Sequence, residues 1–303
     1  MTSSDKLKIA IIGSGNIGTD LMIKVMRSKH LSCTLFAGRN FNSAGMKRAS
    51  QLGVPISDRG IEAIVADPSI CDVVFDATSA QAHVEHWAIL ERLGKTVIDM
   101  TPAKLGEFCI PAINAQACLD TGTRNINMIT CGGQSSIPIA NAISQVHANI
   151  EYIEVASSIA SRSAGPATRA NLDEYIETTE DALQRFSGAR RTKAILILNP
   201  ANPPIDMQTT IYAKIANPDL PAIQAAVAAM VEQLKTYVPG YQLIVPPTIE
   251  GGKVVTTIKV LGAGDYLPQY AGNLDIINCA AIAVAELIAT AKHGKHTKER
   301  KHG

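Results

Sequence analysis

The sequence predicts an α/β protein of two domains, in which a parallel sheet wound with helices is followed by a mixed or antiparallel sheet. Three observations carry this prediction. The chain has 303 residues, more than one domain usually holds. Over the first 130 residues, short β-branched runs alternate with amphipathic stretches. From about Cys131 onward, longer strand-like segments are separated by fewer helices.

The first domain is expected to contain five short strands, at Lys8 to Ile12, Cys33 to Ala37, Val73 to Asp76, Thr96 to Asp99 and Asn127 to Thr130. Between the first two, apolar side chains recur at helical spacing and make one buried face, formed by Ile17, Leu21, Met22, Val25 and Met26. This alternation of strand and helix predicts a doubly wound parallel sheet.

The second domain is expected to contain four longer strands, at Tyr152 to Ala160, Ala194 to Leu198, Gln208 to Ile215 and Lys253 to Leu261. Its expected helices are Ile137 to Val146, Leu172 to Phe186 (with Asn171 as N-cap) and Pro221 to Tyr237. A last apolar helix, Leu274 to Lys292, is expected to pack back on the first domain. We therefore expect residues 1–130 with 272–303 to form the first domain and 131–271 the second, with a disordered basic end from Lys292.

Composition excludes several classes of protein. The formal net charge is +1 and only 4% of the residues are aromatic, so neither the electrostatic attraction nor the stacking surface of a nucleic-acid binder is expected. The first residues lack a secretory apolar core, and the longest apolar helix is interrupted by Asn278 and Glu286, so we expect a cytoplasmic protein without a membrane span. The six cysteines include no C-x-x-C pair and no nearby His at metal-ligand spacing, so no metal site is expected.

A glycine-rich motif follows the first strand and begins the first helix, and it reads Gly13-Ser14-Gly15-Asn16-Ile17-Gly18. It fits G-x-G-x-x-G in the strand–turn–helix context that a dinucleotide-binding (Rossmann) unit requires. The first glycine would permit the tight turn, the second would let the backbone approach the pyrophosphate, and the third would let helix and strand pack closely. The phosphates would lie at the helix N-terminus, where N–H groups and the helix dipole attract negative charge.

The residue that usually distinguishes NAD from NADP is absent. An acidic residue about 20 positions after the motif, at the end of the second strand, normally accepts the ribose 2′-hydroxyl. Here that strand ends in Gly38-Arg39-Asn40, and no Asp or Glu occurs between Asp20 and Asp58. Arg39 could pair with a 2′-phosphate or stack on the adenine. The motif therefore leaves the choice between NAD and NADP open.

Cys131 is the candidate nucleophile. It follows an expected strand and precedes a helix whose first turn carries Pro138. A helix N-terminus stabilises a thiolate, and we expect the N–H groups of Gly132 and Gly133 to be open to an oxyanion. Such a thiolate would add to an aldehyde carbonyl, the thiohemiacetal would lose hydride to a nicotinamide, and an acyl-thioester would remain on the cysteine.

The base is less evident. Phosphorylating dehydrogenases of the glyceraldehyde-phosphate and aspartate-semialdehyde type use a His in the second domain, and this chain has none between His147 and His293. His147 is expected near the far end of the helix after Cys131, too remote to act on it. Asp206, which follows Pro203-Pro204-Ile205, is the candidate base, with an ordinary loop aspartate as the alternative.

A polar loop, Ser161 to Asn171, follows the first strand of the second domain and could wrap the nicotinamide end of the cofactor, with an ordinary surface turn as the alternative. Longer motifs extend the pattern, at Ala10 to Met22, Val74 to Ala80, Met128 to Gln134, Ser163 to Pro166, Thr168 to Asn171 and Tyr266 to Ile276. With these motifs the chain resembles, over nearly its whole length, the acylating acetaldehyde dehydrogenases that work beside 4-hydroxy-2-oxovalerate aldolase in aromatic meta-cleavage pathways.

The resemblance implies that Cys131 forms the acyl-thioester and that coenzyme A resolves it, yielding acetyl-CoA and NADH. It implies a glyceraldehyde-phosphate-dehydrogenase-like architecture with a catalytic and dimerisation domain, a homodimer core, and a complex in which the aldolase passes acetaldehyde through a channel. It also implies cofactor contacts from Ser14, Gly15, Asn16, Ile17, Ser163, Ala164, Gly165, Pro166, Ala167, Thr168, Arg169, Ala170, Asn171 and Asn273.

The chain departs from the family pattern at several places. The family usually has Asp at the end of the second strand, where this chain has Asn40 preceded by Arg39. Ala167 replaces a glycine in a Gly-Pro-Gly loop, and Thr209 stands where relatives carry a carboxylate proposed as base, so Asp206 is only a nearby substitute. The segment between Gln242 and Gly262 also looks shorter, which could alter the dimer or partner surface.

Two other functions stay open on the sequence alone. A phosphorylating semialdehyde dehydrogenase is disfavoured by the missing histidine. A non-catalytic dinucleotide-binding partner that gates an aldolase is disfavoured by the intact Cys131 motif.

Overall fold

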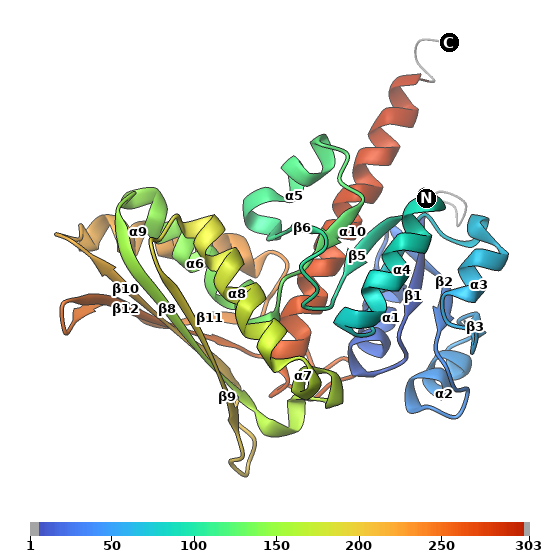
Figure 1. The fold of residues 1–303 in the computed structure, drawn as a ribbon, viewed down its shortest axis with the longest axis horizontal. Coiled ribbons are helices and arrows are strands. Elements are labelled where there is room, and N and C mark those ends of the chain that lie inside the picture. The colour runs from blue at the N-terminus through green and yellow to red at the C-terminus, as the bar shows by residue number, and fades with distance from the viewer. Residues whose placement is uncertain (1–5, 300–303) are drawn as a thin grey trace. The chain divides into compact units, whose positions relative to one another are not determined.

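The computed structural model describes residues 6–299, except for the side chains at 166, 167 and 293–299. The chain divides into two compact units. Unit 1 comprises residues 1–128 and 281–303, and unit 2 comprises residues 129–280. Each unit contains one sheet (Figure 1).

Unit 1 contains a seven-stranded sheet, in the order β3-β2-β1-β4-β5-β7-β6, in which every pair of neighbours is parallel. Its strands are β1 (Leu7–Ile12), β2 (Leu31–Ala37), β3 (Ile56–Ser57), β4 (Val73–Asp76), β5 (Thr96–Asp99), β6 (Glu107–Phe108) and β7 (Asn125–Asn127). Its helices are α1 (Asn16–Arg27), α2 (Ala44–Gln51), α3 (Glu62–Ala66), α4 (Ala80–Arg92) and α5 (Pro111–Asp120). The strand order reverses between β1 and β4, and in such sheets ligands bind beyond the carboxyl ends of the strands at that point.

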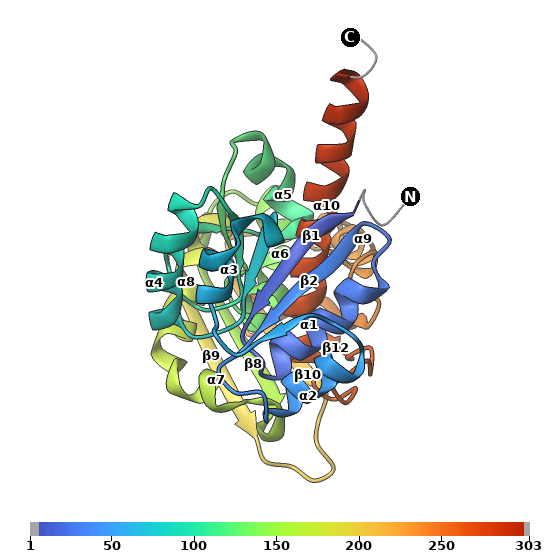
Figure 2. The same ribbon diagram turned by 90° about the vertical axis from the view of Figure 1, so that its right-hand side faces the viewer.

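Both faces of this sheet are covered. On one face, Ala10 and Ile12 pack with Ile64 of α3 and Leu90 of α4, all of them buried. The residues that alternate with them on β1, such as Ile9 and Ile11, are equally buried, and so are the inward residues of α1. Figure 2 shows α3 and α4 on one side of β1 and β2, with α1 and α2 on the other. The strands of this parallel sheet are apolar along their whole length because both faces of the sheet are buried.

Unit 2 contains a five-stranded mixed sheet in the order β11-β12-β10-β8-β9. Its strands are β8 (Ile150–Ala160), β9 (Thr192–Asn199), β10 (Met207–Ile215), β11 (Tyr241–Glu250) and β12 (Lys253–Val260). Only the β8–β9 pair is parallel. Helices α6 (Cys131–Val146), α8 (Leu172–Ser187) and α9 (Leu220–Lys235) cover one face (Figure 1), and the short α7 spans Pro166–Ala170. The predicted α/β class, a Rossmann-type parallel sheet with a second mixed sheet, is confirmed.

The segment around Cys131 differs from its prediction. The strand expected at Asn127 to Thr130 ends at Asn127, because Ile129 adopts the left-handed region with φ 64° and cannot continue an extended chain. The following helix begins at Cys131 rather than Ile137, because the Thr130 hydroxyl caps it by accepting the Gly133 N–H at 2.9 Å. Pro138 therefore lies inside the helix.

Two further predictions were incomplete. Strand β11 was not expected, since Pro246 and Pro247 interrupt its pattern; an edge strand tolerates proline because its outer N–H groups need no partner. Helix α10 (Gly272–Glu299) continues beyond Lys292, so the disordered end expected there was wrong as far as Glu299, while residues 300–303 lie outside the described part.

The first part of α10, Gly272–Lys292, has the length and mean hydropathy of a membrane-spanning helix. However, 67% of its most apolar window is buried within the protein, which is typical of a core helix. Length and composition are therefore weak evidence for a span here.

Candidate active site

The glycine turn of unit 1 has the geometry that a dinucleotide motif requires. Gly13 has φ +112°, and a Cβ there would lie 2.4 Å from the carbonyl oxygen of Ala77. A Cβ on Gly18 would lie 1.9 Å from the carbonyl oxygen of Gly13. A Cβ on Gly15, in contrast, would meet no heavy atom within 4 Å. Gly13 and Gly18 are thus required by packing, and Gly15 faces open space where a pyrophosphate could approach.

The other predicted cofactor residues of unit 1 lie around this turn. The Ser14 hydroxyl accepts a hydrogen bond from Ser43 at 3.1 Å, which ties the turn to the start of α2. Asn16 and Ile17 form the first turn of α1. Arg39 is exposed just beyond the end of β2, where its guanidinium is available to an anion or a ring.

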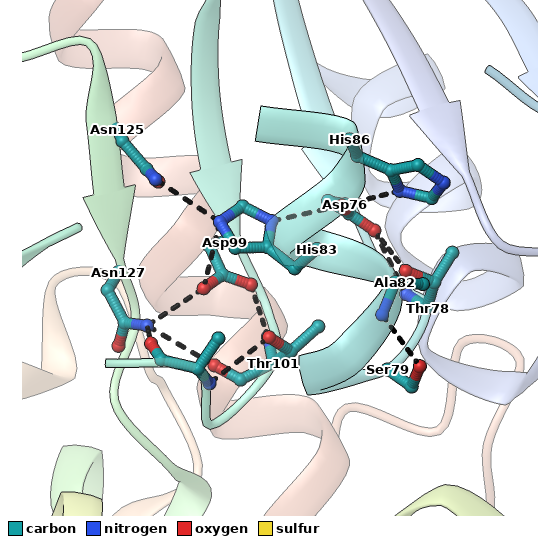
Figure 3. Close-up of polar contacts among 11 residues, drawn as sticks. Asp76, Thr78, Ser79, Ala82, His83, His86, Asp99, Thr101, Asn125 and Asn127 are labelled. Atoms are coloured by element: carbon teal, nitrogen blue, oxygen red, sulfur yellow. Dashed lines mark hydrogen bonds and ion pairs between the residues drawn. The ribbon is translucent and has the colours of Figure 1, made fainter. Parts of the chain in front are cut away.

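Beside the glycine turn, the carboxyl ends of β4 and β5 carry buried ionisable side chains (Figure 3). Asp76 ends β4, Asp99 ends β5, and His83 of α4 lies between them. His83 Nδ1 is 3.0 Å from Asp76 Oδ2, and its Nε2 is 3.4 Å from Asp99 Oδ2. His86 Nδ1 lies 2.9 Å from the same Asp76 oxygen. We call these four residues the charged cluster; among the described residues, no group of His, Cys, Asp or Glu could hold a metal ion.

The two carboxyl groups of the charged cluster have pKa values shifted in opposite directions. Burial alone would raise the pKa of Asp76, but hydrogen bonds from His83 and His86 outweigh it and lower that pKa to about 2. Burial raises the pKa of Asp99 to about 7, although the nearby His83 and the hydrogen bond from the Thr101 N–H act in the opposite direction. Burial also disfavours a charged His83, yet the two carboxylates raise the pKa of the imidazole. Asp99 is therefore the group of the cluster that titrates near neutral pH.

Asp76 also connects the cluster to the glycine turn. Its Oδ1 accepts hydrogen bonds from the Thr78 N–H at 3.2 Å and the Thr78 hydroxyl at 2.5 Å. These bonds fix the turn that holds Ala77, and the Ala77 carbonyl is the group against which Gly13 packs. The charged cluster thus positions one wall of the predicted cofactor site.

In unit 2, Cys131 is the first residue of α6 and is 9% exposed. The hydroxyl of Tyr175, on α8, lies 3.6 Å from its sulfur and accepts the Gly132 N–H at 2.9 Å. The Gly133 N–H is taken by the Thr130 hydroxyl. The expectation that the N–H groups of Gly132 and Gly133 are open to an oxyanion was therefore wrong, because both bind side chains.

Burial raises the pKa of the Cys131 thiol, while hydrogen bonds from Tyr175 and from the N–H groups of Gly132 and Cys131 oppose that rise. The position at a helix N-terminus thus does not by itself make this thiol ionise readily. Its ionisation depends on the donors that reach the sulfur.

Neutral hydroxyls surround this part of α6. Thr209 of β10 contacts the Ser157 hydroxyl at 2.9 Å and the Ser135 hydroxyl at 3.0 Å, and all three side chains are buried. Thr130 contacts Thr179 at 2.7 Å. We call these five residues, with Tyr175, the hydroxyl cluster. Thr209 therefore occupies a site built for a neutral hydroxyl.

Neither Asp206, the candidate base, nor His147, which was expected to be too remote, belongs to the hydroxyl cluster. Asp206 directly precedes β10, is partly exposed, and has its nearest cationic group, Lys259 Nζ, at 3.9 Å. His147 follows the last residue of the 16-residue helix α6, about 24 Å along the axis from Cys131. His147 instead accepts the Asp219 N–H at 2.8 Å, which anchors the start of α9.

The predicted cofactor loop of unit 2 forms a turn at Ser161–Ser163, then Ala164 and Gly165, then α7 with Thr168 and Ala170. Arg169 braces it by donating to the Ser161 carbonyl at 3.0 Å and the Ala164 carbonyl at 3.1 Å. Asn171 precedes α8 as its N-cap residue. Asn273, in the first turn of α10, is 1% exposed, and its Oδ1 has no hydrogen-bond partner among the described residues.

Sequence reasoning missed His83, Asp99 and Tyr175. A signal existed for the first two, because Asp76 and Asp99 each end a β-branched run and parallel strands bring such ends to one edge. Tyr175 gave no local signal, since it contacts Cys131 across 44 positions of the chain.

Comparisons with known proteins agree with this geometry. Residues 8–118 match the semialdehyde dehydrogenase NAD-binding domain, and residues 131–268 match the dimerisation domain of prokaryotic acetaldehyde dehydrogenases. Unit 1 therefore carries a nicotinamide-cofactor domain, and unit 2 contains a dimerisation domain, which supports a homodimer.

Two solved structures share the fold. Aspartate semialdehyde dehydrogenase from Candida albicans, solved with NADP, has a TM-score of 0.60 at 11% identity, over 93% of this chain and 100% of that chain. Aspartate semialdehyde dehydrogenase II from Vibrio cholerae has a TM-score of 0.63 at 14% identity, over 94% and 99%. At such identities the likeness concerns the fold alone, and it confirms the predicted architecture.

Curated relatives cover nearly the whole chain. Acetaldehyde dehydrogenase of Pectobacterium atrosepticum is 77% identical over 290 residues, 96% of this chain and 98% of the relative. The enzyme of the same name from Spirochaeta aurantia is 55% identical over 95% of this chain and 96% of its own length. The chain therefore belongs to the acetaldehyde dehydrogenase family and is an oxidoreductase that uses a nicotinamide cofactor.

Proposed function

We propose that this enzyme converts acetaldehyde, NAD and coenzyme A to acetyl-CoA and NADH through an acyl-thioester on Cys131. The observation that carries the proposal is the position of Cys131 at the first residue of α6, with the Tyr175 hydroxyl 3.6 Å from its sulfur, in a chain of this family. The proposal includes the cofactor contacts that the resemblance implies, among them Ser163 to Asn171 and Asn273.

The residues present fit a nicotinamide cofactor. The space beside Gly15 leaves room for a pyrophosphate at the start of α1, where helix N–H groups favour an anion. The unpartnered Oδ1 of buried Asn273 would accept a hydrogen bond from an amide such as that of nicotinamide. When bound, the cofactor supplies the oxidant by accepting the hydride that the thiohemiacetal carbon releases.

The protein's own part in the reaction starts with the Cys131 thiolate. Its sulfur forms a bond to the aldehyde carbonyl carbon, and the carbonyl electron pair moves to oxygen to give an alkoxide. After the oxidation, the acetyl group remains on Cys131 as a thioester. The sulfur of coenzyme A, deprotonated, then adds to that carbonyl, and the Cys131 thiolate leaves and is ready for another cycle.

Asp206 stays the candidate base for the proton of coenzyme A or of Cys131. Its carboxyl group is partly exposed and lies 3.9 Å from the Lys259 ammonium, so a substrate could reach it from solvent. Thr209 cannot take this role, because a threonine hydroxyl is not basic near neutral pH.

The proposal extends to partners and compartment. In this proposal, a homodimer of the enzyme binds 4-hydroxy-2-oxovalerate aldolase, whose product acetaldehyde is the substrate of the enzyme. The six cysteines are all free thiols, as expected in a reducing cytoplasm.

The test is a steady-state assay of NADH formation from acetaldehyde, with coenzyme A or phosphate as acceptor and NAD or NADP as oxidant. We expect activity that requires coenzyme A, and a loss of at least about a thousandfold in Cys131→Ser, because removing a nucleophile removes the covalent route. Cys33→Ser, a control at a partly exposed thiol outside the site, should keep full activity.

Other results would redirect the proposal. Turnover with phosphate and not coenzyme A would indicate a phosphorylating enzyme. Cofactor binding without turnover, with a faster aldolase, would indicate a gating partner. A preference for NADP would assign Arg39 to the 2′-phosphate.

A further inference from the structure

The Tyr175 hydroxyl is fixed beside the sulfur of Cys131 by the backbone. Its oxygen accepts the Gly132 N–H at 2.9 Å and lies 3.6 Å from the sulfur. The ring is buried, with the residue 6% exposed. A Cβ on Gly132 would lie only 2.2 Å from this hydroxyl, so the glycine after the cysteine is what lets the phenol come so close.

The neighbouring hydroxyls leave few acceptors for the Tyr175 proton. Thr179 donates its proton to the Tyr175 carbonyl at 2.7 Å. In the 2.7 Å contact between Thr130 and Thr179, Thr130 must then be the donor. Thr130 also accepts the Gly133 N–H, and its side chain is in hydrogen-bond contact with the Tyr175 hydroxyl as well. The phenol proton therefore has two acceptors within reach, the Thr130 oxygen and the Cys131 sulfur, and the sulfur becomes the stronger acceptor when it ionises.

The phenol itself remains protonated. Burial, and then the neighbouring Cys131, raises the pKa of Tyr175 well above its ordinary value. Tyr175 is therefore a neutral donor in the pH range in which the thiol ionises. A neutral donor stabilises a thiolate without burying an additional charge next to it.

We infer that Tyr175 is a catalytic residue that holds the Cys131 thiolate by donating its phenol O–H to the sulfur. The inference rests on the proposed role of Cys131 as nucleophile. No proton is transferred: the phenol keeps its hydrogen while the sulfur ionises, attacks the carbonyl, and later leaves as a thiolate again. The same hydrogen bond is thus made when the nucleophile is free and when it departs from the thioester.

The test compares the full-length enzyme with Tyr175→Phe, which removes the hydroxyl and keeps the ring. The rate of alkylation by iodoacetamide is measured on the Cys131 peptide by mass spectrometry from pH 6 to pH 12, because burial places the midpoint above the ordinary value of a thiol. We expect the midpoint to rise by about one pH unit, the tenfold change that a lost hydrogen bond to a charged group produces. The plateau rate should rise about threefold, because a more basic thiolate is more nucleophilic.

Tyr241→Phe is the matched control. Its hydroxyl is equally buried and donates to the Ser135 carbonyl at 2.7 Å on the same helix, without contact to the sulfur. The Cys131 midpoint should stay where it is in this variant, even if thermal stability falls. An unchanged midpoint in Tyr175→Phe, or the same rise in both variants, overturns the inference.

Two further measurements distinguish the possible causes of a negative result. If alkylation of Cys131 leaves activity intact, the nucleophile assignment fails, which is distinct from an unchanged midpoint in an enzyme that alkylation inactivates. If Tyr175→Phe does not fold, 3-fluorotyrosine placed at 175 gives a more acidic donor, and the midpoint must then move down rather than up.

Discussion

The two units bury polar side chains in opposite ways. The charged cluster of unit 1 places His83 between two carboxylates, all fully buried, at the carboxyl ends of β4 and β5. The hydroxyl cluster of unit 2 surrounds the start of α6 with neutral groups, of which Thr209 and Ser157 are examples. One cluster is held together by charge and the other by hydroxyl hydrogen bonds.

The charged cluster serves to position a part of unit 1, whereas the hydroxyl cluster surrounds the residue that carries the chemistry in unit 2. Ionic contacts in a dry interior are costly to break, which suits a cluster that fixes the Thr78 turn against the glycine motif. Neutral hydroxyls impose no net charge on their surroundings, so the ionisation of Cys131 is set by its own donors rather than by a neighbouring acid or base.

The largest expected effect is in the charged cluster. In His83→Gln, Asp76 and Asp99 remain buried without the imidazole between them, and removing one partner of such a buried contact typically costs about 3–5 kcal/mol. The free energy of unfolding is measured by urea titration. Trp87, the one tryptophan of the chain, lies on α4 and makes its fluorescence a reporter of unit 1.

His86→Gln is the control for this prediction. It also removes a contact to Asp76, but its side chain is 14% exposed and water can replace it, so the loss should be about 1 kcal/mol. Equal losses in the two variants would mean that the cluster acts as a neutral hydrogen-bonded network, and the contrast between the units would fail.

The pH dependence of stability should differ between the units. The folded-state pKa of Asp76, about 2, lies below its unfolded value, so its contribution is present above pH 4 and is lost as the pH falls toward 2. Asp99 has the opposite sign: with a folded pKa of about 7, its contribution favours folding at low pH and is lost as the pH rises from about 4 to about 7. The raised pKa of His83 adds a loss as the pH rises through its folded value.

The free energy of unfolding of unit 1 should therefore be lower at pH 8 than at pH 5, as measured by urea titration with Trp87 fluorescence. Asp99→Asn should reduce this difference, since the amide does not titrate, whatever the variant's absolute stability. Thr209→Val, in the hydroxyl cluster, should leave the difference unchanged. If Asp99→Asn keeps the wild-type slope between pH 5 and pH 8, the assignment of this titration to Asp99 is wrong.

The sequence predicted those parts of the molecule that have local signals. The strands of unit 1 were found because β-branched runs alternate with a helical period, and the Gly13 turn because its residue types meet a steric need that the structure displays. Strands β3 and β6 were missed because two residues carry no period. Strand β11 was missed because its prolines are acceptable only at an edge, and edge position is a property of the assembled sheet.

The site divides along the same line. Cys131 is evident from its glycine-rich surroundings, but the groups that control its ionisation are not, because Tyr175 reaches it from another helix. The helix N-terminus suggested a readily formed thiolate, whereas burial, which no local pattern reports, raises the pKa of this thiol. The N–H groups of Gly132 and Gly133 were expected to be open because the sequence does not show which side chains accept them. Tyr175, which accepts the first, is distant in sequence, and Thr130, which accepts the second, does so as the helix cap.

The smallest expected effect is in the hydroxyl cluster. Thr209→Val removes the hydroxyl that contacts Ser135 and Ser157 and leaves a side chain of similar shape. Because Ser135 still donates to the Gly132 carbonyl at 2.9 Å, only part of the network is lost, and the cost should be about 1 kcal/mol. Calorimetry of the full chain measures it as a small shift in the melting of unit 2, with the Cys131 alkylation midpoint unchanged. A loss as large as that in His83→Gln would show that neutral hydroxyls hold unit 2 as firmly as charges hold unit 1, and a shifted midpoint would show that Thr209 acts on the sulfur as well.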